Sequence, residues 1–166
     1  TGGLTAPSGE KLRSTFGNQA MVVPNDADRI AAAAGVTYYD GMRDHCIARV
    51  RDGELLGGTI FQGYTGVSCE MHVASFAPRW ICPDLLWATF AYPFIQLDCK
   101  QVVGRVAETN TRALEFDKKL GFNEVCRIPD YYPDGDLILL TLRRDECRWL
   151  KIAPRSRFWE HPNGEK

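Results

Sequence analysis

A glutamate and a histidine lie two residues apart in a segment whose polar and apolar residues alternate. Residues 66–75 read GVSCEMHVAS, and Glu70 and His72 belong to the less apolar set. Successive side chains of a strand point to opposite faces, so one face of this strand is core and the other carries the ionisable groups. Carboxylates and imidazoles transfer protons in catalysis. Proton transfer is therefore one interpretation of this face, and a solvated or salt-bridged face is the alternative.

A second polar stretch, residues 129–136, reads PDYYPDGD. Three carboxylates and two tyrosines in one short segment favour a positively charged ligand over a negatively charged one. The pattern predicts a loop between two strands. An ordinary solvated turn is the alternative interpretation.

The best-marked helix lies between these two stretches. Residues 101–107 read as a strand, and either Asn110 or Thr111 can cap the helix that follows. Gly121 suits a left-handed residue after the last turn, and residues 123–128 read as the next strand. The apolar positions recur at helical spacing and form one face: Ala113, Phe116 and Leu120.

The other elements follow from turn signals and periodicity. We expect a mixed α/β order that begins with a short strand stopped by Pro24 and a helix from Asp26 to Gly35, and that includes an Asp-Gly hairpin. Pro93 should kink the helix that starts at Pro83. The expected strands are 20–24, 46–50, 55–64, 66–75, 101–107, 123–128 and 137–143.

The composition is that of an ordinary globular protein. The chain has 166 residues, of which 45% are hydrophobic and 25% charged, and fits one domain. A net charge of -1 gives no electrostatic reason to expect nucleic acid or a membrane as partner, and no run of about 18 apolar residues indicates a membrane span. The six cysteines contain no CxxC pair, so we expect reduced thiols in a cytoplasmic protein and no metal.

The expected organisation is a single domain over residues 18–150. Residues 1–17 would form a flexible segment before it, and residues 151–166 a tail. No signal peptide is visible, and the opening TGG, which lacks Met, is excluded from the fold argument.

Three stretches resemble the GNAT superfamily of N-acetyltransferases. They are the strand GVSCEMHVAS, the Arg-led loop into the helix at Pro83, and NTRALEFDKKLGF at 110–122, which resembles the family signature Asn-x-x-Ala/Ser…Leu-Gly-Phe. The resemblance covers about residues 20–143. Within the family, YPF…LDCKQVV and the ending LRRDECRW are most similar to enzymes that acetylate N-termini of ribosomal proteins and to related small bacterial and phage acetyltransferases.

The resemblance implies a mixed α/β fold with a central, splayed sheet of about seven strands flanked by helices. Acetyl-CoA would lie in the splay, with its pyrophosphate at the loop before Pro83. The cofactor-binding residues that it implies are Val73, Ser75, Arg79, Trp80, Ile81, Cys82, Asp84, Asn110, Ala113 and Phe116.

The phosphate loop departs from the family pattern of Arg/Gln-x-x-Gly-x-Gly/Ala. The aligned stretch, 79–84, keeps Arg79 but has neither glycine. Pro83 removes one N–H donor, and Asp84 adds a negative charge near the phosphates.

The implied reaction is direct attack of a primary amine on the thioester. It needs a base for the ammonium proton, with Glu70, His72 and Glu108 as candidates, and a main-chain N–H near Val73 for the developing oxyanion. The acceptor would lie beside Tyr131, Tyr132 and Asp134.

The proton for the leaving sulfur has no assigned donor. The tyrosine that supplies it in the family is replaced by Asp117. Either Ser75, Tyr131 or Tyr132 takes that role, or CoA leaves as a thiolate, which a thiol pKa of about 8.5 tolerates.

The first interpretation is an acetyl-CoA-dependent N-acetyltransferase acting on a protein or peptide amine. One alternative is a catalytically weak GNAT-fold protein that binds CoA or a partner, which the altered loop and the missing tyrosine support. Another is an acetylase of small-molecule amines. Acetyl-CoA and an amine acceptor are the expected partners of a monomer or homodimer, without nucleic acid, membrane or metal.

Overall fold

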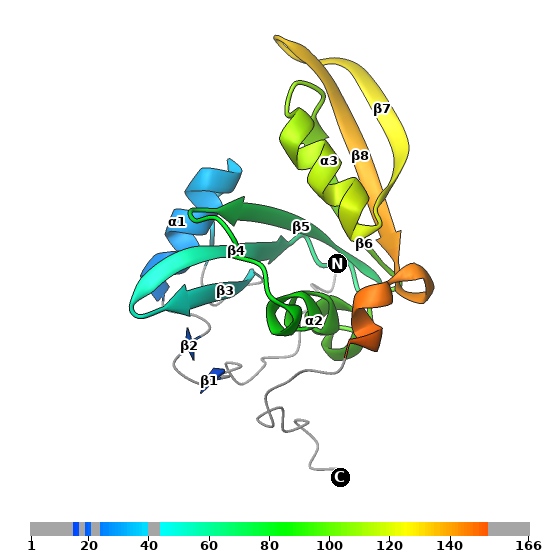
Figure 1. The fold of residues 1–166 in the computed structure, drawn as a ribbon. Coiled ribbons are helices and arrows are strands. Elements are labelled where there is room, and N and C mark those ends of the chain that lie inside the picture. Colours follow the sequence, from blue (N-terminus) through cyan, green and yellow to red (C-terminus); the bar gives the residue numbers. More distant parts are fainter. Residues whose placement is uncertain (1–14, 17–18, 21–23, 40–43, 153–166) are drawn as a thin grey trace.

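The computed structural model describes residues 15–16, 19–20, 24–39 and 44–152 (Figure 1). Its main sheet has six strands in the order β3-β4-β5-β6-β8-β7, and β1 and β2 pair with each other. The strands are β1 (Thr15–Phe16), β2 (Gln19–Ala20), β3 (His45–Arg51), β4 (Glu54–Gln62), β5 (Ser68–Ser75), β6 (Gln101–Ala107), β7 (Asn123–Tyr132) and β8 (Gly135–Arg143). The helices are α1 (Pro24–Ala34), α2 (Pro83–Ala91) and α3 (Thr111–Leu120), with a π-helical turn at Tyr92–Gln96 and 3-10 turns at Arg144–Glu146 and Arg148–Lys151.

The sheet splits between β5 and β6. These two strands are parallel and pair only from Ser68–Glu70 to Gln101–Val103, whereas the other neighbours in the sheet are antiparallel. Beyond Glu70 and Val103 the strands diverge, and Figure 1 shows β3-β4-β5 and β6-β8-β7 opening as the two arms of a V. The expected splay is therefore present.

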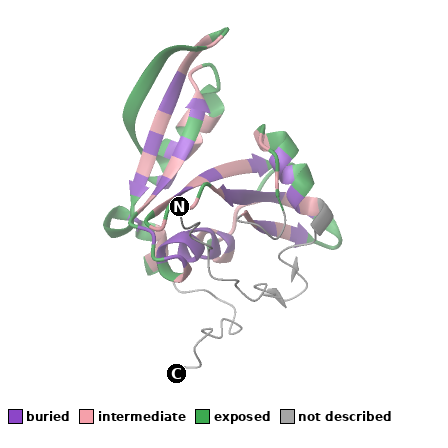
Figure 2. Ribbon diagram, turned by 180° about the vertical axis from the view of Figure 1, so that it is seen from behind, coloured by how far each residue is buried: buried purple, intermediate pink, exposed green. Residues whose placement is uncertain are grey.

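The helices cover opposite faces of the sheet. The residues of α1 pack with Cys46, Ile60 and Ala74, whereas α2 and α3 pack with Met71 and the buried side chains of β6 and β8. Figure 2 shows the buried residues on these facing surfaces and an exposed β7 at the edge of the sheet. Because His72 pairs with Ile60 across the strands, alternation along β5 places it on the α1 face and Met71 on the α2/α3 face.

The sheet has six strands rather than about seven, because the first expected strand is not part of it. Strand β2 covers Gln19–Ala20, residues 21–23 lie outside the described part, and Pro24 begins α1 instead of ending a strand. A proline fits the first helical turn, where its missing N–H has no partner to lose.

The prediction of a loop over residues 129–136 was wrong. Strand β7 continues to Tyr132 and β8 begins at Gly135, so the segment is the end of a hairpin. Pro129 is tolerated because β7 is an edge strand, where an N–H can be missing. Asp130 has φ 52°, and the register shifts between Ile128 and Tyr132, which indicates a bulge that bends the strand.

The helix α3 has the expected caps. Asn110, rather than Thr111, is the N-cap, and its Oδ1 accepts a hydrogen bond from the Ala113 N–H at 3.1 Å. Gly121 has φ 107°, and its N–H donates to the Asp117 and Lys118 carbonyls. These caps end α3 sharply and return the chain to the sheet at β7.

Pro93 lies in a helical turn that continues the chain after α2. The α-helix α2 ends at Ala91, and the π-helical turn that contains Pro93 follows, with the Leu97 N–H donating to the Tyr92 carbonyl at 3.0 Å. A π-turn spaces the backbone bonds more widely, which gives room to a residue that cannot donate.

The six cysteines are free thiols, as expected. Four of them are buried and only Cys126 is exposed. The four buried cysteines pack in the core as small apolar side chains.

Candidate active site

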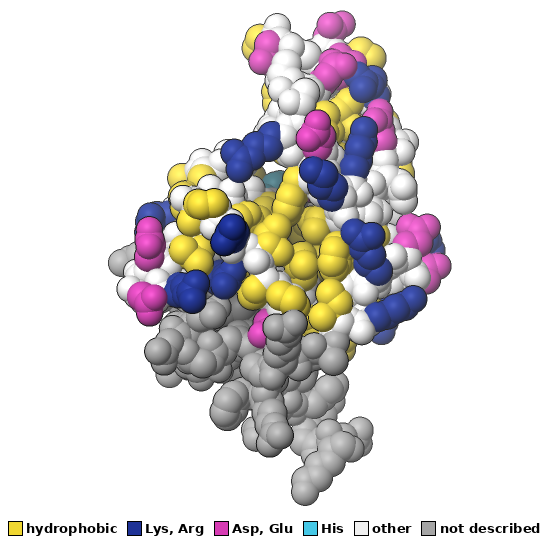
Figure 3. All heavy atoms as spheres, in the orientation of Figure 1, with side chains coloured by type: hydrophobic (Ala, Val, Ile, Leu, Met, Phe, Trp, Pro, Cys, Tyr) yellow, Lys and Arg dark blue, Asp and Glu magenta, His cyan; other side chains and the backbone are white. Residues whose placement is uncertain are grey.

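On the α2/α3 face the splay forms an apolar cleft. Figure 3 shows hydrophobic side chains gathered there, with Lys and Arg side chains around them. About 10 Å³ of free space remains inside. The lining residues are Thr59, Met71, Val73, Trp80, Ile81, Leu85, Leu86, Thr89, Phe90, Phe116 and Leu120.

Trp80 and Phe116 close this cleft from opposite sides. Their ring centroids are 5.9 Å apart, one ring coming from the loop before α2 and the other from α3. The indole lies on Gly57 of β4, where a Cβ atom would be 2.6 Å from the Trp80 Cε3 atom. The absence of a side chain at position 57 therefore allows Trp80 to lie against the strand.

Arg49 of β3 holds the loop that carries Trp80. Its Nη1 donates to the carbonyl oxygens of Arg79 at 2.9 Å and Trp80 at 2.8 Å. In a trans peptide the carbonyl and the following N–H point in opposite directions, so the N–H groups of Trp80 and Ile81 are turned away from Arg49. Arg79 has φ 58°, a left-handed conformation of the kind found in anion-binding nests.

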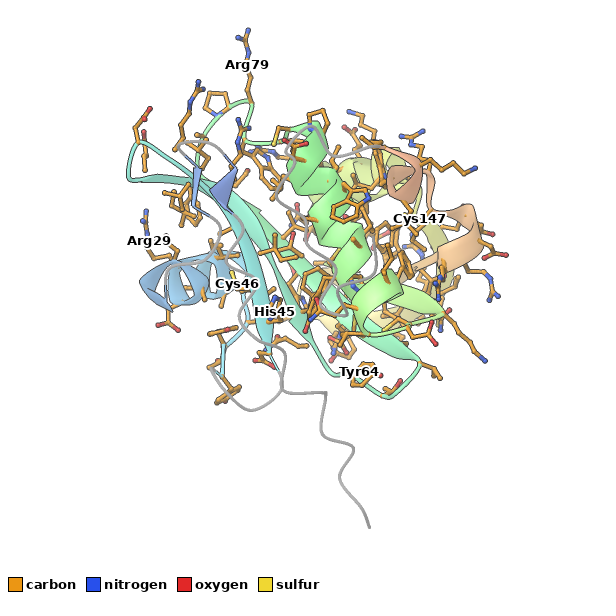
Figure 4. The ribbon with its side chains drawn as sticks, turned by 90° about the horizontal axis from the view of Figure 1, so that it is seen from below. Arg29, His45, Cys46, Tyr64, Arg79 and Cys147 are labelled. Atoms are coloured by element: carbon orange, nitrogen blue, oxygen red, sulfur yellow. The ribbon has the colours of Figure 1, made fainter. Side chains whose placement is uncertain are left out.

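The first turn of α2 has few free N–H groups for an anion. Pro83 has none, the Leu85 N–H donates to the Cys82 sulfur at 3.5 Å, and the Leu86 N–H donates to the Cys82 carbonyl. The carboxylate of Asp84 lies in this same turn. Figure 4 shows the Arg79 side chain pointing away from the molecule.

On the α1 face, charged side chains bridge the two arms of the sheet. The Glu70 carboxylate lies 3.4 Å from His72 Nε2 and 3.7 Å from Arg105 Nη1 on β6. Arg105 also donates to the Tyr131 hydroxyl of β7 at 3.1 Å. Burial is the main influence on His72 and lowers its pKa, while Glu70 acts in the opposite direction. The structure thus brings Glu70, His72 and Tyr131 into one array.

A further carboxylate lies on the same face. Asp44 accepts hydrogen bonds from Gln62 Nε2 and from the Tyr39 N–H. Asp44 directly precedes β3, and Gln62 of β4 is the cross-strand partner of Glu70 of β5, so Gln62 lies between the two carboxylates. Gln62 also donates to the Thr37 carbonyl at 2.7 Å, which fixes the chain after α1 to the edge of this array.

Glu108 is placed apart from Glu70 and His72. It forms an ion pair with Arg127, which also pairs with Asp136 at 3.2 Å. Arg127 is the partner of Ile138, whose side chain belongs to the α2/α3 core, so this group is on the other face of the sheet.

The remaining predicted residues lie outside the Glu70–His72 array. Tyr132 packs edge-on against Tyr131, and the Asp134 carboxylate lies 3.5 Å from the Thr109 hydroxyl at the end of the hairpin. Ser75 is exposed and pairs with Gly57, next to Trp80. Ala113 packs against the α2/α3 core from the first turns of α3.

Asp117 is buried between α3 and β6. Its side chain is turned toward Gly104, where a Cβ atom would lie 3.2 Å from the Asp117 Oδ2 atom. Burial raises the pKa of this carboxyl to about 6.

The sequence reasoning missed Arg49, Asp44, Gln62 and Arg105. Arg105 and Gln62 alternate with apolar residues in predicted strands, so their face could have been read from the sequence. Asp44 lies outside its predicted strand, so alternation does not place it. Arg49 contacts Arg79, which is 30 positions away in the sequence. No local pattern carries such contacts.

A separate open hollow of about 590 Å³ lies away from the splay. Lys100, Arg143, Arg144 and Lys151 are among its lining residues, and none of the predicted site residues is. In the described part of the chain no group of three or more His, Cys, Asp or Glu could hold a metal ion. None of the helices described is both long and apolar enough to cross a bilayer.

The acyl-transfer site that the resemblance implies would need an apolar channel and a proton acceptor; the cleft is apolar, and the array contains a carboxylate and an imidazole. A pantetheine arm needs an apolar channel, which Met71, Val73 and Phe116 line, and a pyrophosphate needs N–H donors and cations at its mouth. Trp80 is one of the lining residues, and with only about 10 Å³ free the lining side chains have to move for such an arm to enter. On the opposite face, Glu70 and His72 are suited to remove a proton from an amine.

No protein-family model matches the chain, and no curated protein matches it.

The fold is similar to solved structures of acetyltransferases. A probable acetyltransferase superposes with a TM-score of 0.54 at 18% identity, covering 63% of this chain and 63% of that chain. The chain thus spans less than two thirds of that structure's length. Spermidine N-acetyltransferase SpeG from Vibrio cholerae, as a mutant, gives a TM-score of 0.53 at 17% identity, covering 64% and 67%.

Another structure of Vibrio cholerae SpeG, described as a spermidine/spermine N-acetyltransferase in mutant form, gives a TM-score of 0.58 at 14% identity. It covers 76% of this chain and 94% of that chain. At identities this low, the superpositions show a similar fold but say nothing of the substrate. The splayed sheet, its strand order and these superpositions show that the chain has the GNAT fold.

Proposed function

We propose that this protein is an acetyl-CoA-dependent N-acetyltransferase that moves an acetyl group directly to a primary amine of a protein or peptide. The observation that carries the proposal is the arrangement around the splay. An apolar cleft lies on one face, a Glu70–His72 pair lies on the other, and the two meet where β5 and β6 separate.

The donor would enter from the α2/α3 face. The apolar cleft would take the pantetheine arm once Trp80 has moved from it, and the N–H groups of Trp80 and Ile81 would bind the pyrophosphate. Beyond Glu70, the peptide groups that β5 turns toward β6 have no strand partner among the described residues. They are therefore free to donate to a thioester carbonyl, which is the role required around Val73.

The acceptor amine would approach from the α1 face. A neutral His72 next to Glu70 can accept the ammonium proton, since burial keeps its pKa low. Tyr131 is held by Arg105 at the edge of this array and would contact the acceptor. Glu108 is engaged by Arg127, so we assign the base to Glu70 and His72.

A small polyamine is the second candidate acceptor. Asp44 and Glu70 place two carboxylates on the acceptor face, which suits a ligand with more than one positive charge. Two of the structures with this fold are described as spermidine or spermidine/spermine acetyltransferases. The folds alone do not choose between peptide and polyamine.

The test is release of free CoA thiol from acetyl-CoA in the presence of an amine panel. The panel contains peptides with free N-termini, the same peptides with blocked N-termini, spermidine and spermine. Turnover that requires a free N-terminus supports the proposal. Turnover with polyamines alone would show that the acceptor is a polyamine and not a peptide. Binding of acetyl-CoA without turnover on any amine overturns the proposal in favour of a catalytically weak protein.

A further inference from the structure

Four cationic side chains surround the open hollow at the closed end of the V. Its volume of about 590 Å³ is in the range of small-molecule sites, roughly 300–1,000 Å³. The cations come from three segments: Lys100 precedes β6, Arg143 and Arg144 lie where β8 ends, and Lys151 belongs to the last 3-10 turn. Figure 1 shows the 3-10 turns after β8 at this end of the molecule, away from the open ends of both arms.

Backbone hydrogen bonds hold these segments together. The Arg144 N–H donates to the Lys100 carbonyl at 3.0 Å, next to the antiparallel pairing of β6 with β8. The Lys100 N–H donates in turn to the carbonyl of Val67, just before β5, at 2.7 Å. The cations therefore converge on the hollow through the folded sheet, and a ligand would find them already in place.

The two arginines are only loosely engaged. Arg144 pairs with Asp98, and Arg143 pairs with Asp145 at 3.5 Å. The side chains of these two carboxylates are 84% and 78% exposed. Ion pairs this exposed contribute about 0–1 kcal/mol, so another anion can replace the carboxylates easily.

The two lysines have no anionic partner. Neither Lys100 nor Lys151 forms an ion pair with a described residue, and both are exposed. Among the described lining residues, four are positively charged and two negatively charged, although the chain as a whole has a net charge of -1. Like charges that converge repel one another, and a bound anion would remove this cost.

We propose that this hollow binds a chain of two or more phosphate groups. A guanidinium group can donate two parallel hydrogen bonds to a phosphate, and an ammonium group neutralises a phosphate as a point charge. None of the described lining residues is aromatic, so a base would find no ring on which to stack, and recognition falls on the phosphates. This site is separate from the splay and does not depend on the proposed function.

Isothermal titration of tripolyphosphate into the whole chain tests the proposal. The buffer contains about 0.15 M salt, which screens scattered surface charges. We expect saturable binding at a single site, and Lys100→Gln combined with Lys151→Gln should weaken it about tenfold or more.

The matched control is Lys118→Gln combined with Lys119→Gln. It removes the same charge from two exposed positions on α3 that do not line the hollow, and it should leave the affinity unchanged. Equal weakening by the two pairs of substitutions, or no saturable binding by the wild type, would overturn the proposal.

A second variant should bind more tightly. Asp98→Asn combined with Asp145→Asn frees both arginines, and Asn tolerates the φ of 53° at position 98. We expect the affinity for tripolyphosphate to rise about fivefold, because the anion no longer competes with two carboxylates. A damaged fold cannot produce such a gain, so an unchanged or weaker affinity contradicts the proposal.

Related anions identify the group that is recognised. Citrate carries fewer charges, on carboxylates of a branched skeleton, and should bind about tenfold more weakly than tripolyphosphate. Equal affinity for citrate would overturn the assignment to phosphate. ATP distinguishes the source: affinity equal to that of tripolyphosphate supports a site for the phosphates of a nucleotide, and weaker binding supports a site for free polyphosphate.

Acetyl-CoA, which also carries phosphates, separates this site from the donor cleft. The protein with Lys100→Gln and Lys151→Gln should bind acetyl-CoA as the wild type does. Loss of both ligands in this variant would mean that the hollow is part of the donor site, which would overturn the proposal. If the wild type binds tripolyphosphate but not acetyl-CoA, the proposed function fails and this proposal stands.

Discussion

Arg49 donates from one guanidinium nitrogen to two successive carbonyl oxygens, those of Arg79 and Trp80. Both bonds are made across the edge of the sheet, from β3 to the loop before α2. They fix the direction of the N–H groups of Trp80 and Ile81, which belong to the same two peptide units. Under the proposed function, this contact would do what glycines do in the loop that the resemblance implies, where the backbone turns its donors toward a phosphate.

Replacing Arg49 by Met should therefore weaken acetyl-CoA binding through its phosphates. We expect KM for acetyl-CoA to rise about tenfold, which corresponds to the loss of hydrogen bonds to a charged group. KM for acetyl-pantetheine, which lacks the pyrophosphate, should not change. Steady-state kinetics with both donors is the measurement.

The matched control is Arg51→Met, which removes the same charge from the same strand. Arg51 is exposed and should leave both KM values unaltered. Equal effects of the two substitutions would indicate a general charge effect, and equal effects on the two donors would indicate a disordered loop.

Gly57→Ala should push Trp80 away from the sheet. The new Cβ atom would be 2.6 Å from Trp80 Cε3 and 2.9 Å from the Ala74 carbonyl oxygen, and the second contact is with backbone that cannot easily yield. We expect a loss of roughly 1–3 kcal/mol in the free energy of unfolding. Urea denaturation measures it.

A double-mutant cycle separates the two contacts. In the background of Trp80→Ala the ring is absent, so the same glycine substitution should cost less. An identical cost in both backgrounds would show that the indole does not lie on Gly57.

Features that depend on neighbouring residues in the chain can be predicted from this sequence. The sequence predicts the end of α3 at Gly121 and its N-cap at either Asn110 or Thr111, because caps depend on neighbours a few residues away; the structure selects Asn110. The alternation in β5 likewise placed Glu70 and His72 on one face. Both features depend only on the residue types within a few positions along the chain.

Features that depend on which strands and side chains meet in the fold could not be predicted from the sequence. The sequence predicts a loop at 129–136 because prolines and Asp-Gly are turn signals, and only the edge position of β7 makes Pro129 compatible with a strand. The contact of Arg49 with Trp80 joins residues that no pattern relates. The separation of Glu108 from Glu70 depends on the face that Arg127 occupies.

Glu70 and Glu108 give opposite predictions although both are carboxylates beside an arginine. Glu70→Gln should lower kcat about 100-fold, because the array around His72 loses its anionic partner. Glu108→Gln should leave kcat close to wild type, since its pair with Arg127 is exposed and on the other face. The comparison is made with the same amine at saturating acetyl-CoA. A larger loss in Glu108→Gln would reverse the assignment of the base.

Asp117 should make the protein less stable as the pH rises. The pKa of its carboxyl is about 6 in the folded protein and 3.8 in the unfolded chain, so the folded state binds the proton more tightly. The resulting stability is fully present below pH 3.8 and is lost as the pH rises to about 6. Above pH 6 the free energy of unfolding of Asp117→Asn should therefore exceed that of wild type, by up to about 3 kcal/mol. Near pH 4 the two proteins should differ little. Urea denaturation at pH 4 and pH 7.5 measures the difference, with Glu115→Gln as the control that should show none. A gain that is equal at both pH values would mean that the carboxyl is not buried in its charged form.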